Sequence, residues 1–511
     1  MLTYDFHDQG TDSLYTYLYR RIRADILAGR LAGGEKLPSK RALAAQLGIS
    51  VITVENAYAQ LTAEGYLRAK ARSGYYVEEI GDILLRPEMG RGEVVKGFPD
   101  PESGSQASGG HGSGDHAGSH PASDVLSPQP RIDLVDSHAD PALFPFPLWS
   151  RLLHEILRTK QEDLLRRPPG TGVPELREAI AQFLLQYQSL SVSPEQIVIG
   201  AGTEYLYGLL IRLLGPEKIY AVETPGYQKT ARIYASNRVE VKSIPMDEYG
   251  IDVALLEKSG ADIVHISPSH QFPTGITMPV NRRSALLSWC REAEGRYVIE
   301  DDYDSEFRLS GKPVPSLMSM DRSGRVIYLN TFTKSVASTI RISYMVLPDL
   351  LMKRYRELLG FYSCTVPTFE QYVLAAFIRR GHFEKHINRV RTSYRKKRDH
   401  LLAALRASAL AGRIEILGAD TGLHFLLRVH VPLSEKELAE RAAKAGVRIH
   451  GLSHYETPGA RIHGLSRYEA PGAQARPEVS EMSVPCMVVS CQGLSEDQIE
   501  RLPGLLAGAW L

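Results

Sequence analysis

The segment Arg296-Tyr-Val-Ile-Glu300-Asp301-Asp302-Tyr303-Asp304 is a short apolar run that ends in a cluster of carboxylates. Four similar β-rich runs, at 196–199, 218–222, 261–267 and 325–329, alternate with longer helical stretches. This alternation predicts an α/β fold, with a parallel-rich sheet and helices on both of its faces. Ligands of such sheets bind beyond the carboxyl ends of the strands, so the residues that follow each run are the place to look for a site.

Several of those residues are of types that bind ligands. Gly200-Ala-Gly202-Thr203 leads into an apolar helix, and a glycine turn at a helix N-terminus suits a phosphate, although ordinary turn chemistry is an alternative. Tyr227 follows the second run, where its ring would either stack on a planar ligand or join the core. Asp301 needs a cation, a metal or a protonated ring nitrogen beside it. Lys334 follows the last run and is placed to act as a Schiff-base amine.

Together these residue types describe a pocket for pyridoxal 5′-phosphate. Lys334 would form the Schiff base, Asp301 would pair with the pyridinium nitrogen, Tyr303 would bind the ring oxygen and Tyr227 would cover the ring. We expect no metal, because no histidine is suitably spaced in the sequence beside the acids that follow residue 300. The predicted phosphate ligands are Gly202, Thr203, Thr331 and Arg341.

Residues 11–80 predict three short helices and a hairpin. Apolar residues recur every fourth position from Leu14 to Ile26, which indicates the first helix. Ser39 and Ser50 are placed to cap the second and third helices, and residues 67–77 fit two strands joined by a tight turn. This is the arrangement of a winged helix-turn-helix, which inserts one helix into the major groove of double-stranded DNA.

The charge of this region agrees with DNA binding. From residue 20 to residue 72 there are ten basic and four acidic residues, a local net charge of +6, and phosphate neutralisation needs such an excess. An ordinary solvated face is the alternative interpretation. The predicted DNA-binding residues are Ser39, Lys40, Arg41, Ser50, Thr53, Lys70, Arg72 and Gly74.

Composition narrows the class of protein. The 511 residues carry 60 Lys+Arg and 59 Asp+Glu, which excludes a uniformly basic nucleic-acid coat protein. Four cysteines without a CxxC pair indicate reduced thiols, and no run of eighteen apolar residues occurs, so we expect a cytoplasmic protein without a membrane span. Residues 101–130 hold seven Ser, six Gly and four Pro and no aromatic residue, so we expect residues 81–130 to be a flexible linker.

Sequence motifs in the two regions resemble those of known families. Leu37-Pro38-Ser39-Lys40-Arg41, Leu47-Gly48-Ile49-Ser50 and Gly65-Tyr66-Leu67 resemble the winged helix of GntR regulators. The region after the linker resembles a fold-type I aminotransferase, and its phrases at 267–275, 300–307 and 331–334 resemble those of the MocR subfamily, which joins the two domains.

The resemblance implies an aminotransferase-like effector domain over 131–511, with a large subdomain at about 131–355 and a small one at about 356–511. It also implies a homodimer, domain-swapped head-to-tail. The chain is therefore interpreted as a DNA-binding transcriptional regulator that senses an amino compound, or pyridoxal phosphate itself, through an aldimine on Lys334. The alternatives are a catalytically active aminotransferase tethered to DNA and a regulator that has lost its cofactor.

Three positions depart from the family pattern. Val51 stands where GntR regulators have an arginine, and Arg167 stands where related enzymes have a tyrosine that reaches the neighbouring subunit's phosphate. Residues 485–493 lack the arginine that holds a substrate carboxylate in aminotransferases. Lys229 and Arg476 are the residues that we consider as effector-binding substitutes.

A tandem repeat is peculiar to this chain. Residues 448–460 are followed by a copy at 461–473 that differs at two positions. Only one copy can occupy the strand register of a sheet, because a shift in register moves every side chain. We therefore expect residues 447–450 to keep the strand and much of the second copy to be an exposed excursion.

Overall fold

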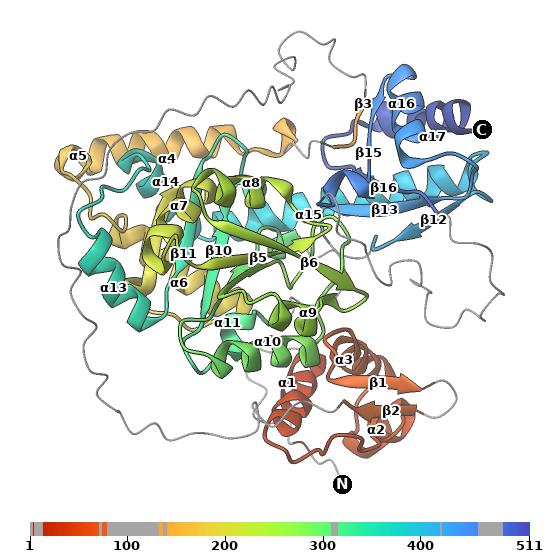
Figure 1. The fold of residues 1–511 in the computed structure, drawn as a ribbon, viewed down its shortest axis with the longest axis horizontal. Coiled ribbons are helices and arrows are strands. Elements are labelled where there is room, and N and C mark those ends of the chain that lie inside the picture. The colour runs from red at the N-terminus through yellow and green to blue at the C-terminus, as the bar shows by residue number, and fades with distance from the viewer. Residues whose placement is uncertain are drawn as a thin grey trace, which may run out of the picture.

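The computed structural model of the chain describes residues 4, 14–70, 74–78, 132–135, 140–307, 315–419, 422–457 and 484–511. Three parts follow one another along the chain: a small helical domain, a large sheet flanked by helices, and a smaller sheet with helices of its own (Figure 1). Within these ranges no helix combines the length and the apolar character needed to cross a membrane. The predicted linker at 81–130 lies outside the described residues.

The first part is the predicted winged helix. Ser39 Oγ accepts a hydrogen bond from the Ala42 N–H (3.2 Å) and Ser50 Oγ accepts one from the Thr53 N–H (3.1 Å), so both serines cap helices as the sequence predicts. A two-stranded antiparallel hairpin follows the third helix. The elements are α1 (Leu14–Leu27), α2 (Lys40–Leu47), α3 (Val51–Ala63), β1 (Leu67–Lys70) and β2 (Gly74–Val77).

An eight-stranded sheet forms the centre of the second part, in the order β4-β11-β10-β9-β8-β5-β6-β7. The five predicted β-rich runs are all strands here, with ends that differ by at most two residues. The sheet is mixed because β11 lies antiparallel between β10 and β4, and β7 lies antiparallel to β6. The strands are β4 (Ile197–Ala201), β5 (Ile219–Thr224), β6 (Glu240–Asp247), β7 (Gly250–Ile251), β8 (Ile263–Ile266), β9 (Tyr297–Asp301), β10 (Val326–Thr331) and β11 (Ile342–Val346).

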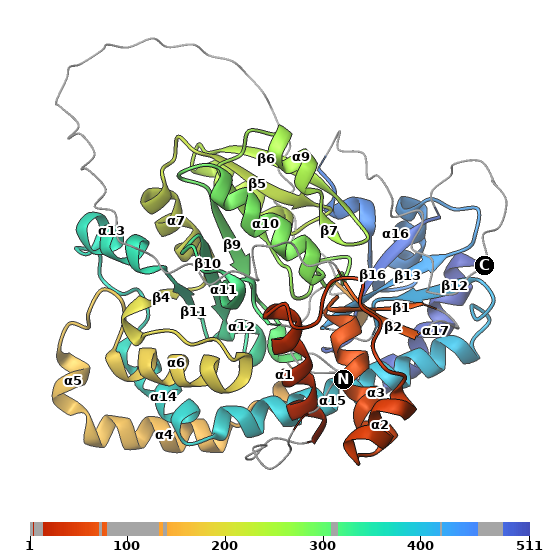
Figure 2. The ribbon, with the colours of Figure 1, turned by 90° about the horizontal axis from the view of Figure 1, so that it is seen from below.

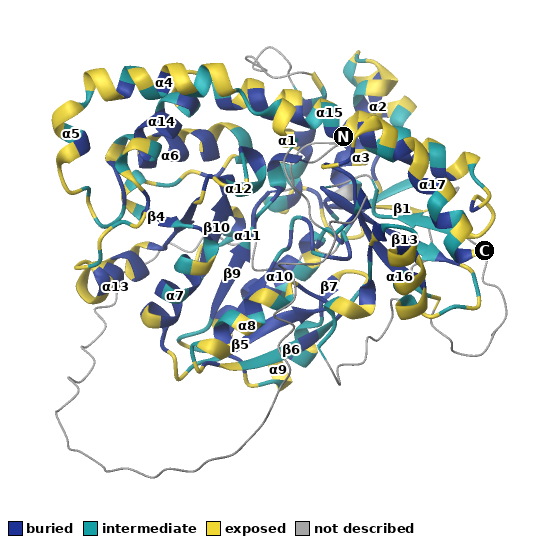
Figure 3. Cartoon of the chain, turned by 90° about the horizontal axis from the view of Figure 1, so that it is seen from above, coloured by how far each residue is buried: buried dark blue, intermediate teal, exposed yellow. Residues whose placement is uncertain are grey.

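Helices cover both faces of this sheet, because alternate strand residues point to opposite sides. Ile299 and Ile327 pack under α7, α8 and α13, whereas Val298 and Val326 pack under α9, α10 and α11. The helices α4, α6 and α14 cover the end of the sheet near β4 and β11, and the strands lie buried beneath them (Figure 3). The helices are α4 (Phe146–Thr159), α5 (Gln161–Leu165), α6 (Pro174–Gln188), α7 (Thr203–Leu214), α8 (Gln228–Ser236), α9 (Val253–Lys258), α10 (Val280–Glu292), α11 (Leu317–Met320), α12 (Phe332–Ser335), α13 (Asp349–Leu359) and α14 (Thr368–Arg379).

The third part is a four-stranded sheet in the order β12-β13-β16-β15 with helices on one face. The long helix α15 joins it to the second part: its first half packs in the core of the large sheet and its second half in the core of the small one (Figure 2). The elements are β3 (Ile132–Asp133), α15 (His382–Ala407), β12 (Ile414–Leu417), β13 (His424–Val429), α16 (Glu435–Lys444), β14 (Val447–Arg448), β15 (His450–Gly451), β16 (Cys486–Ser490) and α17 (Glu496–Trp510).

The first copy of the repeat keeps the strand register. Val447 and Arg448 form β14, which pairs with β3, and His450 pairs with Val488 of β16. The prediction that residues 447–450 keep the strand is therefore confirmed at 447–448 and at His450, with a break at Ile449. The second copy, at 461–473, lies outside the described residues.

The winged helix packs against the start of α10 in the large part. The Val280 N–H donates to the Glu64 carbonyl (3.2 Å), and apolar side chains of both parts share one core cluster. Gly65 lies in the left-handed region at φ 76°, and a Cβ there would fall 2.9 Å from Pro279 Cβ. Only glycine therefore permits this approach of the two backbones.

We predict that Gly65→Ala loosens this contact. The matched control is Gly34→Ala, because Gly34 has a similar φ of 80° and no atom within 4 Å of an added Cβ. Both variants should lower the stability of the winged helix by about 1–2 kcal/mol through left-handed strain. Only Gly65→Ala should increase hydrogen exchange at the start of α10, measured by mass spectrometry. Equal exchange in both variants would mean that the contact does not depend on Gly65.

Candidate functional site

A cavity of about 350 Å³ lies where the ends of the large-sheet strands meet the small part. Its volume is in the range of small-molecule sites, which is about 300–1,000 Å³. Three residues of the small part, Leu423, His424 and Ser490, contribute to its wall. The sequence-predicted residues that line it are Thr203, Tyr227, Lys229, Asp301, Tyr303, Thr331, Lys334 and Arg341.

Asp301 lies at the end of β9 with one oxygen satisfied by the protein. Its Oδ2 accepts a hydrogen bond from the Tyr207 hydroxyl (2.6 Å) and lies 3.4 Å from His265 Nε2. Its Oδ1 is buried and has no partner among the described residues. Burial and the Asp301 charge raise the pKa of Tyr207 well above its ordinary value, so this hydroxyl keeps its proton and donates.

The partners of Asp301 were missed by the sequence analysis. Tyr207 lies on α7, one turn after Thr203, and His265 lies on β8, the strand beside β9. His265 is oriented by the Tyr234 hydroxyl, which is 2.7 Å from its Nδ1. The only sequence signal was His265, a polar residue within the apolar run 263–266. Its partner can be identified only after the strand order is known.

A second set of polar groups surrounds the N-terminus of α7. Gly202 precedes this helix at φ 88°, and the Arg341 guanidinium lies beside it. Glu204, in the first turn, forms an ion pair with Lys229 and lies 3.5 Å from Arg341 Nη2. A carboxylate therefore occupies the region between two cations where an anionic group of a ligand would bind.

Lys334 and Thr331 approach the cavity from the end of β10. Lys334 lies on the short helix α12, and its side chain lines the cavity. Thr331 Oγ1 accepts a hydrogen bond from the Ser343 hydroxyl (2.8 Å) and caps α12 by accepting from the Thr333 N–H (3.2 Å). These bonds hold the backbone that carries Lys334.

Two tyrosines stand on other walls of the cavity. Tyr303 has its hydroxyl 3.2 Å from His270 Nδ1, and burial together with the Asp304 and Asp301 charges raises its pKa well above the ordinary value. Tyr227 is 55% exposed, so the structure places it at the cavity and not in the core. Its ring meets Phe272 edge-on, with 6.0 Å between the ring centroids.

Glu223 adds a second carboxyl group to the cavity wall. Its Oε2 accepts a hydrogen bond from the Ser267 N–H (3.1 Å). Burial raises the pKa of Glu223 to about 7, and the Asp301 charge adds to this effect. The neutral form of Glu223 is therefore populated at neutral pH, and this limits the negative charge beside Asp301.

Two of the remaining predicted positions, Arg72 and Arg476, lie outside the described residues. Arg167 donates a hydrogen bond to the Ser363 hydroxyl (2.7 Å) and is exposed.

Comparisons with known proteins follow the same division of the chain. The family "Bacterial regulatory proteins, gntR family" matches residues 14–77, and "Aminotransferase class I and II" matches residues 142–464. The chain is 38% identical to the uncharacterized HTH-type transcriptional regulator YdeL of Bacillus subtilis, over 86% of this chain and 89% of that protein. It is 31% identical to the "Probable rhizopine catabolism regulatory protein MocR" of Rhizobium meliloti, over 86% of each chain. The chain belongs to the MocR group of GntR transcriptional regulators.

The fold of the MocR effector domain is that of aminotransferases. The crystal structure of the kynurenine aminotransferase of Pyrococcus horikoshii matches with a TM-score of 0.61 and 26% identity, over 74% of this chain and 91% of that one. The predicted family and fold class are therefore confirmed.

The winged helix of this MocR-group regulator exposes the N-terminal end of α3. Val51 is 41% exposed and Ile52 is 68% exposed, unusual values for apolar residues. Lys40 forms an ion pair with Glu55, and Arg41 and Lys70 are exposed. Ser50 Oγ lies 2.8 Å from Thr53 Oγ1, so both hydroxyls stand at the same end of α3. This end of the helix presents apolar groups suited to thymine methyls beside cations suited to phosphates.

We predict that Glu204→Gln strengthens the binding of a phosphate-bearing ligand. Glu204 is half exposed and competes with an incoming anion for Lys229 and Arg341. Its removal should tighten the binding of inorganic phosphate or pyridoxal phosphate by roughly two- to ten-fold, the scale of about 1 kcal/mol for an exposed ion pair. Calorimetric titration measures this change, and Glu178→Gln, which breaks an exposed ion pair with Arg379 away from the cavity, is the control. Weaker binding by Glu204→Gln would contradict the assignment of this end of the cavity to an anion.

Proposed function

We propose that this MocR-group chain is a DNA-binding transcriptional regulator that holds pyridoxal 5′-phosphate in the cavity and responds to an amino compound or to the cofactor itself. The observation that carries this proposal is the meeting of Asp301, Tyr303 and Lys334 in one cavity, in a chain that also bears a winged helix. As a protein that contacts DNA, it would act in the cytoplasm.

The residues of the cavity fit this cofactor. The buried Oδ1 of Asp301, which has no partner in the described part of the chain, would be satisfied by a protonated ring nitrogen. Thr203 and Arg341 would bind the phosphate at the N-terminus of α7, and Tyr227 would cover the ring. When bound, pyridoxal phosphate supplies an aldehyde that reacts with primary amines, and Lys334 is the amine of this chain placed to hold it. Gly202 would allow the phosphate to approach the backbone, and Thr331 would complete the cradle.

A loop of the large part connects the cavity to the winged helix. Ser267 and Phe272 line the cavity, and the same loop ends at Pro279, which faces Gly65. The buried Arg283 guanidinium holds both ends of the loop, because it donates to the Pro268 carbonyl (2.8 Å) and the Met278 carbonyl (2.9 Å). An effector that shifts the cavity end would therefore move the surface on which the winged helix rests.

We also propose a homodimer, domain-swapped head-to-tail, in which the winged helix of one protomer contacts the large part of its partner. Gly65 and Pro279 meet within one chain here, and in the swapped dimer the same two surfaces would meet between two chains. Two winged helices would then bind two half-sites of a double-stranded DNA operator.

The cofactor site is tested by the visible absorption of the purified protein and by borohydride reduction with peptide mapping. We expect a visible band and a label on Lys334, and we expect Lys334→Ala to lose both. The matched control is Lys242→Ala, which should keep the band because Lys242 is paired with Glu240 on β6 and does not line the cavity. A label on another lysine would refute the assignment of Lys334. A colourless wild-type protein, even with excess cofactor, would instead favour a regulator without a cofactor.

The DNA interface is tested with Arg41→Ala. Arg41 is exposed on α2, so its loss should remove one phosphate contact. Binding to mixed-sequence duplex DNA should weaken, and the slope of log affinity against log salt should fall by about one. Arg406→Ala removes an equal charge from the last turn of α15 and is the control. An unchanged salt slope in Arg41→Ala would place this face of α2 away from DNA.

A further inference from the structure

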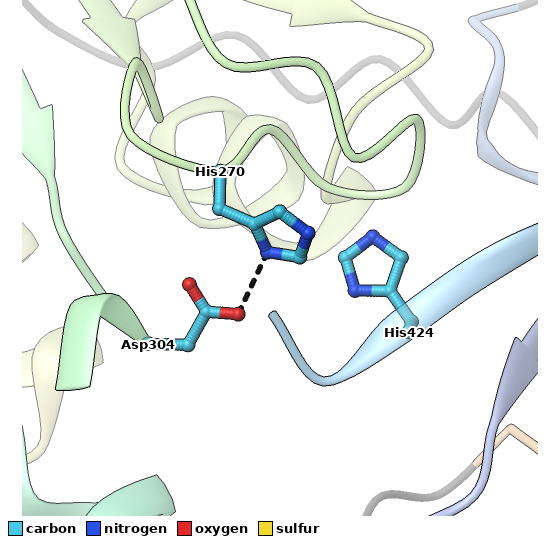
Figure 4. A group of neighbouring side chains, drawn as sticks. All are labelled: His270, Asp304 and His424. Atoms are coloured by element: carbon cyan, nitrogen blue, oxygen red, sulfur yellow. Dashed lines mark hydrogen bonds and ion pairs between the residues drawn. The ribbon is translucent and has the colours of Figure 1, made fainter. Parts of the chain in front are cut away.

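Three buried side chains from separate segments meet beside the cavity (Figure 4). His270 lies in the loop after β8, Asp304 lies after β9, and His424 is the first residue of β13 in the small part. One ligand atom from each, a ring nitrogen or a carboxylate oxygen, lies within 4.8 Å of the other two. All three side chains are at most 5% exposed.

The hydrogen bonds of the described residues leave this cluster incomplete. His270 Nδ1 lies 2.7 Å from Asp304 Oδ2, which accounts for one nitrogen of that ring. The Nε2 atoms of His270 and His424 are both buried and have no partner in the described parts of the chain. The two rings lie 4.5 Å apart, centroid to centroid, and Figure 4 shows the second nitrogen of His270 on the side that faces His424. Buried polar atoms without partners are rare, and each one calls for an explanation.

A simple His–Asp pair does not explain the cluster, because it would satisfy only His270 Nδ1. Burial and the neighbouring His270 ring lower the pKa of His424 well below its ordinary value, so this imidazole is neutral and one of its nitrogens keeps a lone pair. Imidazole nitrogens are common zinc ligands, and a carboxylate bonded to the other nitrogen of such a ring fixes its orientation.

We propose that His270 and His424 bind a divalent transition-metal cation, that their imidazole nitrogens favour Zn²⁺, and that Asp304 holds the other nitrogen of the His270 ring. Water or a bound ligand would complete the tetrahedral coordination. The sequence does not predict this site, because its residues lie far apart along the chain. His270 stands 34 residues before Asp304, and His424 stands 120 residues after it.

The cation would tie the large part to the small part. His270 and Asp304 belong to the large part and His424 to the small one, so binding would favour the arrangement in which the two parts are close. His270 also lies in the loop that ends at Pro279, against which Gly65 packs. This proposal depends on the cluster alone and holds with or without pyridoxal phosphate in the cavity.

The experiment uses the full-length protein, stripped of metal with a chelator and dialysed against Zn²⁺, with the bound metal counted by plasma mass spectrometry. Co²⁺ difference absorption reports the ligand geometry. We expect one high-affinity ion per chain, and we expect His270→Ala and His424→Ala to weaken its binding by at least about ten-fold. His430→Ala is the matched control, because His430 is an exposed histidine just beyond the same strand, and it should bind as the wild type does.

Two further variants keep the test decisive. His424→Phe preserves a ring that can pack against Phe272 but removes both nitrogens, so it should lose the ion even if His424→Ala unfolds. Replacement of His111, His116 and His120 by alanine removes the histidines of the predicted linker and should leave the ion in place. The proposal is overturned if the folded wild type binds no ion, if His424→Phe binds as tightly as the wild type, or if the linker variant loses the ion.

Discussion

A carboxylate held at the end of a buried strand is the constraint on which the cavity depends. Asp301 has one oxygen bound by Tyr207 and one that is buried with no partner among the residues that the structure describes. This arrangement requires α7, β8 and β9 to meet at one edge of the sheet. The relay from Tyr234 through His265 reinforces that geometry. Because an unpaired buried charge is costly, a carboxylate in this position favours a cationic ligand.

The second organising feature is the loop from Ser267 to Pro279. Its first residues border the cavity, and its last residues support the winged helix. The buried Arg283 guanidinium and the Gln271 side chain, which donates to the Pro225 carbonyl at 2.9 Å, give the loop a defined shape without regular secondary structure. A ligand site and a DNA-binding domain are thus joined by a short, hydrogen-bonded path, which is the kind of connection that a regulator needs and that an enzyme does not.

The N-terminus of α7, where the cavity would hold a phosphate, differs from a simple anion site in its charges. Glu204 neutralises Lys229 and lies near Arg341, so two cations that the sequence suggested for ligand binding already share a carboxylate. Binding of an anion must then compete with an internal partner, and affinity becomes adjustable through a single exposed residue. The sequence predicts the cations but not their neutralisation, because Glu204 becomes their neighbour only in the folded chain.

Local patterns in the chain were sufficient to predict the winged helix with its two serine caps and the five runs that form strands. They also predicted the order of Asp301, Tyr303 and Lys334 at the ends of those strands. These features depend on periodicity, capping and the period-two pattern of strands, all of which act over a few residues. The antiparallel β11, the Tyr207 and His265 partners of Asp301, and the meeting of His270 with Asp304 and His424 depended on the tertiary structure. They join segments tens to more than a hundred residues apart, and only the packing of the sheets determines which of those segments become neighbours.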